Sequence, residues 1–379
     1  MEFHIDREQF LKALQRTQGV AELRNTMPIL GYVLLEASED QTVTLLATDT
    51  EISLKSLLSA EVMEPGSIAI LASRLFEIVR ELPRGVPIRL RQEEDSYRCY
   101  LTCGRSRFVL QGLPGDEFPE YQDISSLVRF DIESNTLAAM INRTHFSMSQ
   151  DESRFALNGV CLQLEPPSED HAETILRLVA TDSHRLSLVE EALLVVPEGL
   201  DALREVILPR KGVQEVRRLL EVGEGLVSVE LSHQHIRCIR DHTVLTSKLV
   251  SGRFPNYRKV IPANNDLLLT VDKEELQLVV KRIAAISNEK SRSLQLIIES
   301  GRLIVTTNNP DQETAEEEMV IQYDGPAMVI GFNARYIQDI LAVIAGHSVR
   351  FHLKDSEGPA LVTDPDQDHY RFVLMPMRV

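Results

Sequence analysis

The chain has little cysteine, and no part of it has the long apolar run that a membrane helix needs. The four cysteines lie in strand-like, largely apolar segments without CxxC spacing, and they are Cys99, Cys103, Cys161 and Cys238. This setting favours free buried thiols over disulfides or metal ligands. No apolar stretch approaches the roughly 20 residues of a membrane helix. Residues 1–6 already have the pattern of a strand and a helix start rather than of a signal peptide. These absences predict a globular protein of the reducing cytoplasm.

Motifs for catalysis and nucleotide binding are also missing. The 18 glycines are scattered in turns, so they form no P-loop or dinucleotide fingerprint. Asp182, Ser183 and His184 include a nucleophile and a base, but neighbours in a strand or tight turn point apart. His233 and His235 could share a strand face, yet a third metal ligand is not evident. We therefore expect no enzymatic activity, cofactor or metal, with hydrolase chemistry around Asp182 and His184 as an alternative.

The sequence does contain one pattern three times. Residues 3–6, 130–133 and 269–272 alternate apolar and polar side chains, as a half-buried strand does, and each ends at an acidic helix-start residue. Further on, an apolar run is closed by residues 47–49, 180–182 and 306–308, and a second helical pattern follows each time. A period well over a hundred residues is too long for a solenoid unit, so each copy is interpreted as a domain.

Within each copy the expected order is strand, helix, strands, helix, strands. Strand pairs are predicted at 31–36 with 42–47, at 160–164 with 176–180, and at 294–299 with 303–307. Helical spacing recurs at 71–82, 213–220 and 336–341. The predicted fold class is α+β, with three similar domains that each pack two helices on antiparallel sheet. Polar, turn-rich stretches place the domains at 1–125, 126–262 and 263–379.

Positive charge is scarce, because 40 Lys and Arg face 57 Asp and Glu, for a net charge of −17. Such a balance normally argues against nucleic acid. Basic residues nevertheless gather on the predicted helices, at Arg16, Arg74, Arg80, Arg143, Arg210, Lys211, Lys281 and Arg282. Cations favour the last turn of any helix, and charged faces are usually just solvated. Arg16, Arg143 and Arg282 stand at the same position of the first predicted helix in each of the three copies. This recurrence favours a shared function over mere solvation.

Several short segments together resemble a known family. They are residues 27–31, 104–108, 180–186, 208–213, 246–255, 287–290 and 375–378. In this order, over the whole chain, they are similar to the bacterial DNA polymerase III beta subunit, the family of sliding clamps. The resemblance implies a head-to-tail homodimer ring, with helices around a central hole and sheet outside. It also implies binding of double-stranded DNA without sequence specificity.

The resemblance further implies three sets of functional residues. For DNA it adds the loop residues Arg24 and Gln150 to the helix bases. For the subunit interface it selects Arg98, Arg105, Arg107, Phe108 and Leu110 against Ala285, Ile286, Asp311, Glu313, Glu316 and Glu317. For a partner-peptide pocket it selects Leu157, Thr181, His184, Arg185, Leu186, Pro255, Val260, Val373, Met375, Pro376, Met377 and Arg378.

The expected partners are the polymerase III alpha subunit, the clamp loader, and other polymerases or repair proteins. They would insert short linear motifs with Leu and Phe anchors into an adaptable methionine-bearing surface, where Arg185 and Arg378 could hold peptide carbonyls or carboxylates. Three departures from the family pattern bear on peptide preference: Ser183 replaces a usual glycine, Lys259 an arginine, and Pro359 a residue that can be serine. Phe155 stands where paired tyrosines can occur.

Simpler explanations remain open for each set. Acidic runs are usually solvated loops, Phe155 can be ordinary strand packing, and the C-terminal strand can merely complete a sheet. A repeat-built peptide-binding scaffold that never encircles DNA is the alternative function. The helix bases discriminate between the two, since they have a purpose only around DNA.

Overall fold

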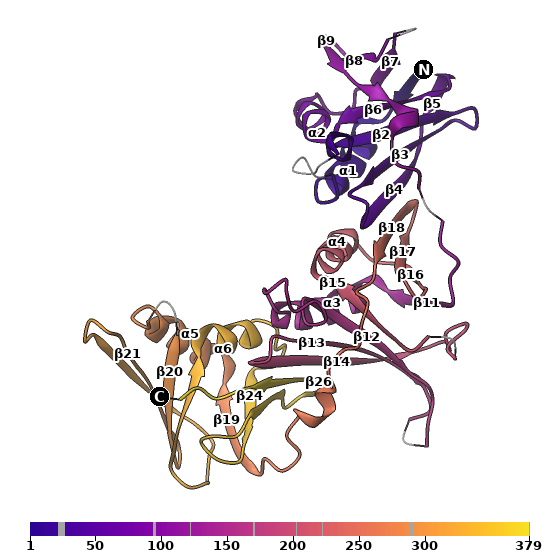
Figure 1. The fold of residues 1–379 in the computed structure, drawn as a ribbon. Helices are drawn as coiled ribbons and strands as arrows, with labels where there is room; N and C mark the ends of the chain where they lie inside the picture. The colour runs from indigo at the N-terminus through magenta and orange to yellow at the C-terminus, as the bar shows by residue number, and fades with distance from the viewer. Residues whose placement is uncertain are drawn as a thin grey trace. The chain divides into compact units, whose positions relative to one another are not determined.

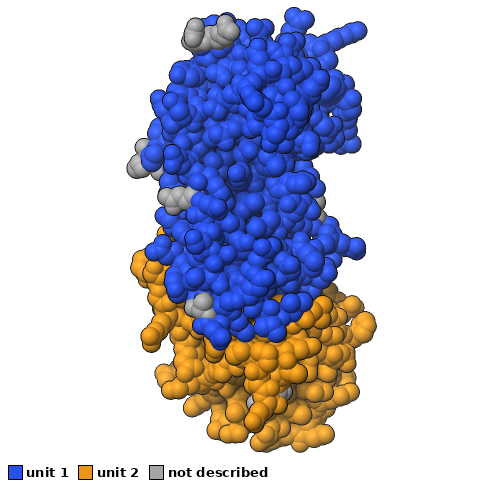
Figure 2. Space-filling view, turned by 90° about the vertical axis from the view of Figure 1, so that its right-hand side faces the viewer, with its two compact units in different colours: residues 1–137, 195–203, 211–249 blue, residues 138–194, 204–210, 250–379 orange. Residues whose placement is uncertain are grey.

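The computed structural model describes residues 1–21, 27–93, 96–121, 123–169, 171–201, 203–221, 223–288 and 291–378. These residues pack into two compact units, coloured separately in Figure 2. Unit 1 comprises residues 1–137, 195–203 and 211–249, and unit 2 comprises residues 138–194, 204–210 and 250–379. The central third of the chain thus contributes to both units, and the expected three-domain boundaries stay a prediction.

Unit 1 contains two antiparallel sheets among its described residues. A five-stranded sheet has the order β5-β1-β7-β8-β9, with β5 Glu61–Glu64, β1 Glu2–Ile5, β7 Ile88–Gln92, β8 Arg98–Cys103 and β9 Ser106–Gln111. A nine-stranded sheet has the order β10-β6-β2-β3-β4-β18-β17-β16-β11. Its strands are β10 Leu113–Pro114, β6 Gly66–Leu71, β2 Tyr32–Ser38, β3 Thr42–Thr48, β4 Ile52–Ser59, β18 Thr243–Lys248, β17 His235–Arg240, β16 Leu226–Leu231 and β11 Val128–Glu133.

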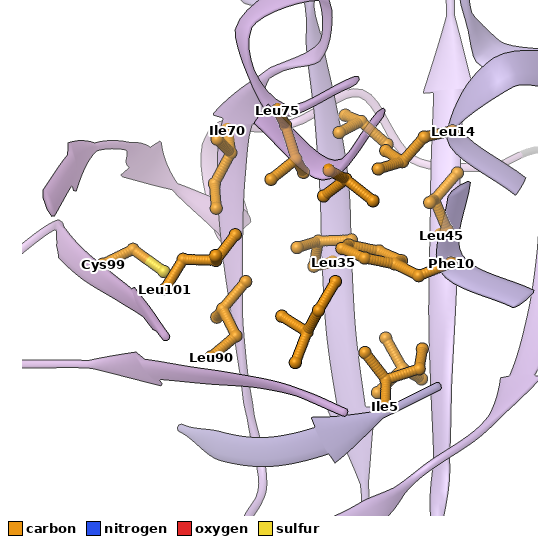
Figure 3. Packing of buried hydrophobic residues seen from close by; sticks show 14 of the residues in the cluster. Ile5, Phe10, Leu14, Leu35, Leu45, Ile70, Leu75, Leu90, Cys99 and Leu101 are labelled. Atoms are coloured by element: carbon orange, nitrogen blue, oxygen red, sulfur yellow. The ribbon is translucent and has the colours of Figure 1, made fainter. Parts of the chain in front are cut away.

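Helices α1 (Arg7–Thr17) and α2 (Ala72–Glu81) lie side by side over the strands of unit 1 (Figure 1). Helix α1 starts where Asp6 accepts a hydrogen bond from the backbone N–H of Gln9 at 2.9 Å, which satisfies one of the unpaired donors of the first turn. The helices bury Phe10, Leu14 and Leu75 against side chains from both sheets (Figure 3). This cluster also encloses Cys99 and Cys103, which are free thiols.

Unit 2 is also built on antiparallel sheets. An eight-stranded sheet has the order β15-β12-β13-β14-β26-β25-β24-β19, with β15 Glu205–Pro209, β12 Gly159–Glu165, β13 Thr174–Thr181, β14 Arg185–Leu193, β26 Gln367–Leu374, β25 Ala360–Asp364, β24 Ser348–Leu353 and β19 Leu267–Asp272. A four-stranded sheet has the order β22-β21-β20-β23, with β22 Thr314–Val320, β21 Arg302–Asn308, β20 Ser293–Glu299 and β23 Met328–Asn333.

Four further helices complete the described chain. Helices α5 (Lys273–Ala284) and α6 (Ala334–Leu341) pack on each other in unit 2. Helix α3 (Ser134–Thr144) contributes residues to both units, and α4 (Arg210–Leu220) belongs to unit 1 from its second residue on. Single 3-10 turns occur at Pro28–Gly31, Gly115–Glu117, His145–Ser147 and Tyr257–Lys259. The described residues include no helix that is long and apolar enough to span a membrane.

The predicted repeat is confirmed at the turn that follows its first strand pair. In the β3–β4 turn, the carboxylate of Asp49 accepts hydrogen bonds from the backbone N–H groups of Glu51 and Ile52, at 2.9 and 2.6 Å. In the β13–β14 turn, Asp182 accepts them from His184 and Arg185, at 2.9 and 3.0 Å. The third copy has a longer loop between β21 and β22, so the repeat diverges there.

Sheet continuity between the copies is repeated as well. Strand β4, which follows the first turn, pairs with β18, the last strand of the three-strand meander β16-β17-β18. Strand β14, which follows the second turn, pairs with β26, the last strand of the meander β24-β25-β26. By the same rule β22 should pair with β9, the last strand of β7-β8-β9. Within the chain, however, β9 and β22 each end their own sheet.

Candidate functional site

The helix base Arg16 is packed between secondary-structure elements. Its Nη1 donates to the hydroxyl of Thr243 on β18 at 2.6 Å, while Nε and Nη2 are buried and have no hydrogen-bond partner in the described part of the chain. Burial, and then the nearby Arg240, lower the pKa of Arg16. Arg16 therefore fastens α1 to the sheet, which fits a DNA contact poorly.

The two bases that open α4 are also engaged. Nη2 of Arg210 donates to the carbonyls of Met148 and Ser149, at 3.0 and 2.6 Å, and burial lowers the pKa of its guanidinium. Lys211 forms an ion pair with Asp49 of the β3–β4 turn. Both side chains hold α4 against neighbouring turns, so they are only partly available to a ligand.

The remaining helix bases differ in how far they reach solvent. Arg143 lies over the ring of Tyr370 at 4.5 Å from its centroid. Arg80 pairs with the adjacent Glu81 at 3.0 Å and stays exposed. Arg74, Lys281 and the loop residue Gln150 are exposed, whereas Arg24 lies outside the described residues.

Arg282, a predicted DNA contact, pairs with Glu317, a predicted interface residue. Its Nε donates to Glu317 at 2.9 Å, and this bond raises the pKa of the guanidinium and lowers that of the carboxylate. The structure thus brings together two residues that sequence reasoning assigned to different sites. Arg282 is exposed and Glu317 is half-buried at the surface, so the pair contributes little to stability.

The predicted interface residues lie on and beside the edge strands β9 and β22. Arg107 is exposed on β9, and Arg98 and Arg105 are exposed nearby. On the acidic side, exposed residues are Ala285, Asp311, Glu313 and Glu316, while Ile286 is half-buried. On β9, Leu110 is buried in the core of unit 1 and Phe108 is half-buried against it.

Sequence reasoning missed the apolar residues that these edges expose. Val109 on β9 is 61% exposed, and Val320 on β22 is 81% exposed. The alternation of each strand gives the signal, since the neighbours Leu110 and Met319 are buried. Each edge therefore offers one large apolar side chain among charges of a single sign, basic on β9 and acidic on β22.

The predicted peptide site is built in unit 2 on a buried apolar cluster. Leu186 on β14 and Val373 on β26 are opposite each other in the sheet and buried, and they pack with Phe254 and Tyr257. Leu157 is half-buried against the same cluster. Phe254 and Tyr257 were not predicted for this site, although their motif at 254–257 repeats that at 118–121, whose Phe118 and Tyr121 pack in an apolar cluster of unit 1.

More exposed residues surround this cluster. The chain continues beyond β26 as Met375 bonds its N–H to the carbonyl of His184 at 2.9 Å and Met377 bonds to Gly331 of β23 at 2.8 Å. The C-terminal segment thus does complete a sheet, and then runs on to a second one. His184, Pro255, Val260, Met375 and Arg378 are exposed, and Thr181, Pro376 and Met377 are half-buried.

Arg185, which the resemblance selects for the peptide pocket, is a buried and internally paired cation. Its side chain is 6% exposed, with Nε bonded to Asp182 at 3.1 Å and Nη1 to Asp339 of α6 at 2.6 Å. Nη2 donates to the carbonyl of Phe146, and the guanidinium lies over the ring of Tyr336. Arg185 therefore ties β14 to α6 beneath the site.

The structure gives the conformation and exposure of the residues that depart from the family pattern. Ser183 has φ +77° in the β13–β14 turn, a conformation that glycine adopts at little cost, and Thr50 has φ +79° in the repeated turn. Lys259 is exposed, and the carbonyl of half-buried Pro359 accepts a bond from Asn265 at 2.8 Å. Phe155 is 71% exposed in a turn, so the strand-packing explanation for it is wrong.

The residue types considered for catalysis have other partners. Asp182 caps its turn and holds Arg185, while Ser183 accepts a bond from Arg154 at 3.3 Å. His233 is exposed, and burial lowers the pKa of His235. Among the described residues no group of three or more His, Cys, Asp or Glu is placed to hold a metal.

Comparison with known proteins identifies relatives over the whole chain. Models of the DNA polymerase III beta subunit match in three parts: the N-terminal domain at residues 1–122, the central domain at 131–256 and the C-terminal domain at 258–378. The beta sliding clamps of Caulobacter vibrioides and Pseudomonas aeruginosa are each 40% identical, and that of Escherichia coli is 37% identical. Each alignment covers 100% of both chains.

Solved structures agree in fold. The sliding clamp of Bartonella birtlesii, bound to griselimycin, superposes with a TM-score of 0.94 at 38% identity, and that of Caulobacter crescentus with 0.91 at 39%. Both comparisons cover 100% of each chain. The three-domain fold of helices on antiparallel sheets is thereby confirmed. With full-length relatives and all three domain models in agreement, the chain belongs to the DNA polymerase III beta subunit family, the sliding clamps of DNA replication.

Proposed function

We propose that this chain is a noncatalytic subunit that assembles head to tail into a homodimeric ring around duplex DNA. The proposal rests on a type of strand pairing that the chain makes twice within itself, and for which two further edge strands have no partner in the described part of the chain. β4 pairs with β18 and β14 with β26, while β22 and β9 remain at sheet edges. Pairing β22 of one copy with β9 of another would repeat the junction, and a second such contact closes a dimer.

Charge supports this pairing. Strand β9 and its turn carry Arg105 and Arg107, whereas β22 carries Glu316, Glu317 and Glu318. Complementary strands of this kind favour the correct orientation and speed association, and the wrong pairing of like edges is repelled. Val109 and Val320 supply exposed apolar area that such a contact would cover.

The domain boundaries 1–125, 126–262 and 263–379 belong to the same proposal. Each domain then provides two helices, and helix bases would face the DNA. Arg74, Arg80, Lys281 and Arg282 are the exposed helix bases that support this role. Few solvated cations on an acidic chain suit loose contact with phosphates, because strong pairing would hinder sliding. We place Arg16 and Arg210 outside this set, since their guanidiniums are engaged internally.

The second part of the proposal is that the apolar surface of unit 2 tethers partners. The replicative alpha subunit, the clamp loader and other polymerases or repair proteins would insert a short motif with Leu and Phe anchors. The buried residues Leu186, Val373 and Tyr257 would form the base of the peptide surface. The exposed residues Val260 and Met375 would form its apolar rim. The thioether of Met375 adapts to different side chains.

Lysine at the rim is expected to weaken peptide binding about tenfold or more, which is roughly 1.4 kcal/mol. Val260→Lys and Met375→Lys each replace an exposed apolar side chain, so they leave the fold intact but put a charge where an apolar anchor must be desolvated. Fluorescence anisotropy with a labelled peptide carrying Leu and Phe anchors measures the affinity.

A matched control is Leu268→Lys, which makes the same kind of change at a similarly exposed residue of β19. It should bind the peptide like the unsubstituted chain. If all three variants bound the peptide with equal affinity, the tethering surface would not lie in this part of unit 2.

A further inference from the structure

One hollow of unit 1 lies on the solvent face of the five-stranded sheet. Its volume is about 540 Å³, and it is lined by Arg89, Arg91, Glu93, Tyr100, Thr102, Gly104 and Arg107. None of these residues is a helix base or part of the peptide surface of unit 2, and Arg107 belongs to the β9 edge of the proposed subunit interface.

Strand register explains why these side chains meet. Thr102 on β8 is paired with Arg89 on one side and with Arg107 on the other. In the next row, Tyr100 is paired with Arg91 and with Val109. The residues that alternate with them, such as Leu90 and Leu101, are buried in the core. One face of the sheet is thus apolar core, and the other presents three arginines, Arg89, Arg91 and Arg107, around the ring of Tyr100.

The hollow is positively charged in spite of the acidic chain. Between residues 88 and 111 there are five arginines and three acidic residues, against 40 and 57 in the whole chain. Glu2 bonds Arg89 at 2.7 Å and lies 3.7 Å from Arg91, so a single carboxylate faces two guanidiniums. The arginine side chains are 51% and 59% exposed, which leaves donors open to a ligand while Glu2 orients them.

The apolar residues indicate what kind of ligand fits. Tyr100 is partly exposed directly beside the arginines, whereas Val109 belongs to the β9 edge that the second copy would cover. Tyrosine and arginine are the residue types that dominate binding energy at protein interfaces. A nucleic-acid backbone would meet the carboxylate of Glu93 at the rim, which disfavours it.

We propose that this hollow binds an acidic, extended segment of a partner protein, with carboxylates on Arg89 and Arg91 and an apolar side chain over Tyr100. It is a second contact surface, separate from the tethering site of unit 2. Because electrostatics contribute much of the attraction, binding should weaken as salt is raised.

The test uses the full chain and two short fluorescein-labelled peptides, one with leucines between glutamates and one with glutamine in place of every glutamate. The glutamate peptide should bind, and the Arg89→Gln/Arg91→Gln variant should weaken it by roughly tenfold or more at low salt. Tyr100→Ala should also weaken it, by roughly fivefold. Arg84→Gln, at an exposed arginine outside the hollow, should leave affinity unchanged.

Three results would overturn the proposal: equal binding of both peptides, affinity that ignores the arginine substitutions, or arginine-dependent binding of a short single-stranded oligonucleotide in place of the peptide. Thermal unfolding of each variant shows that the fold is kept. The mass of the assembly and the binding of the Leu/Phe peptide, measured on the same variants, test the ring and the tether independently.

Discussion

A chain with both Arg105 and Arg107 changed to glutamate is expected to be monomeric, with the mass of one 42.8 kDa chain, whereas the unsubstituted protein is expected to have twice that mass. The change makes the β9 edge acidic and sets it against the acidic β22 edge. Like charges brought together at an interface cost several kcal/mol, which is on the order of a hundredfold or more in the dissociation constant. Light scattering after size exclusion measures the mass.

The reciprocal chain gives this test its control. Glu313→Arg with Glu316→Arg reverses two charges on the other edge and should also yield monomers. Mixing the two variants restores opposite charges at both junctions of a head-to-tail dimer, so a heterodimer should form where neither variant dimerises alone. Dimers in either single variant, or no dimer in the mixture, would contradict the proposed interface.

Arg185→Ala is expected to reduce the stability of unit 2 by about 3–5 kcal/mol. The substitution leaves the carboxylates of Asp182 and Asp339 without the cation that joins them, and it also removes a donor to the carbonyl of Phe146. The loss should be local to β14 and α6. Hydrogen exchange of the backbone amides in these elements, followed by mass spectrometry, measures the free energy of opening.

Arg302→Ala is the matched control, because Arg302 is exposed and pairs with Glu299 and Glu318 at the surface. Surface ion pairs are typically worth less than about 1 kcal/mol, so this variant should open nearly like the unsubstituted chain. If Arg185→Ala protected its amides as well as Arg302→Ala does, the buried network would not have the role assigned to it.

Local patterns were enough to predict the elements and their repetition. The alternation at 3–6 and 269–272 correctly gave strands β1 and β19, and the acidic residues Asp6 and Asp272 proved to be helix N-caps. The Ala-Thr-Asp segments predicted equivalent turns because one carboxylate serves two backbone donors in each of the first two copies. These features depend on neighbours in sequence, which the sequence displays directly.

Partners distant in sequence could not be predicted in the same way. Arg185 meets Asp339 from 154 residues away, and Lys211 meets Asp49 from 162 residues away. The local sequence around a basic residue is the same whether its side chain is solvated or paired inside the protein. Sequence reasoning therefore grouped Arg16 with exposed bases such as Arg74, and assigned Arg282 and Glu317 to different sites.

The edge strands β9 and β22 could be predicted more fully than these distant partners. The interface residues came from resemblance, but topology leads to the same two strands independently, because the two internal junctions show which elements pair. The exposed Val109 and Val320 would have been found by extending the strand alternation through β9 and β22. What sequence could not supply is that both strands end their sheets.

Retention on DNA of different topology tests the ring most directly. The chain is loaded on a nicked circular duplex by a bacterial clamp loader with ATP, the loader is removed, and bound protein is followed before and after a single cut opens the circle. A ring held by linkage stays on the circle and is lost rapidly once free ends exist. Equal retention on circular and linear DNA would contradict encirclement, and no retention on either would favour a scaffold that only binds peptides.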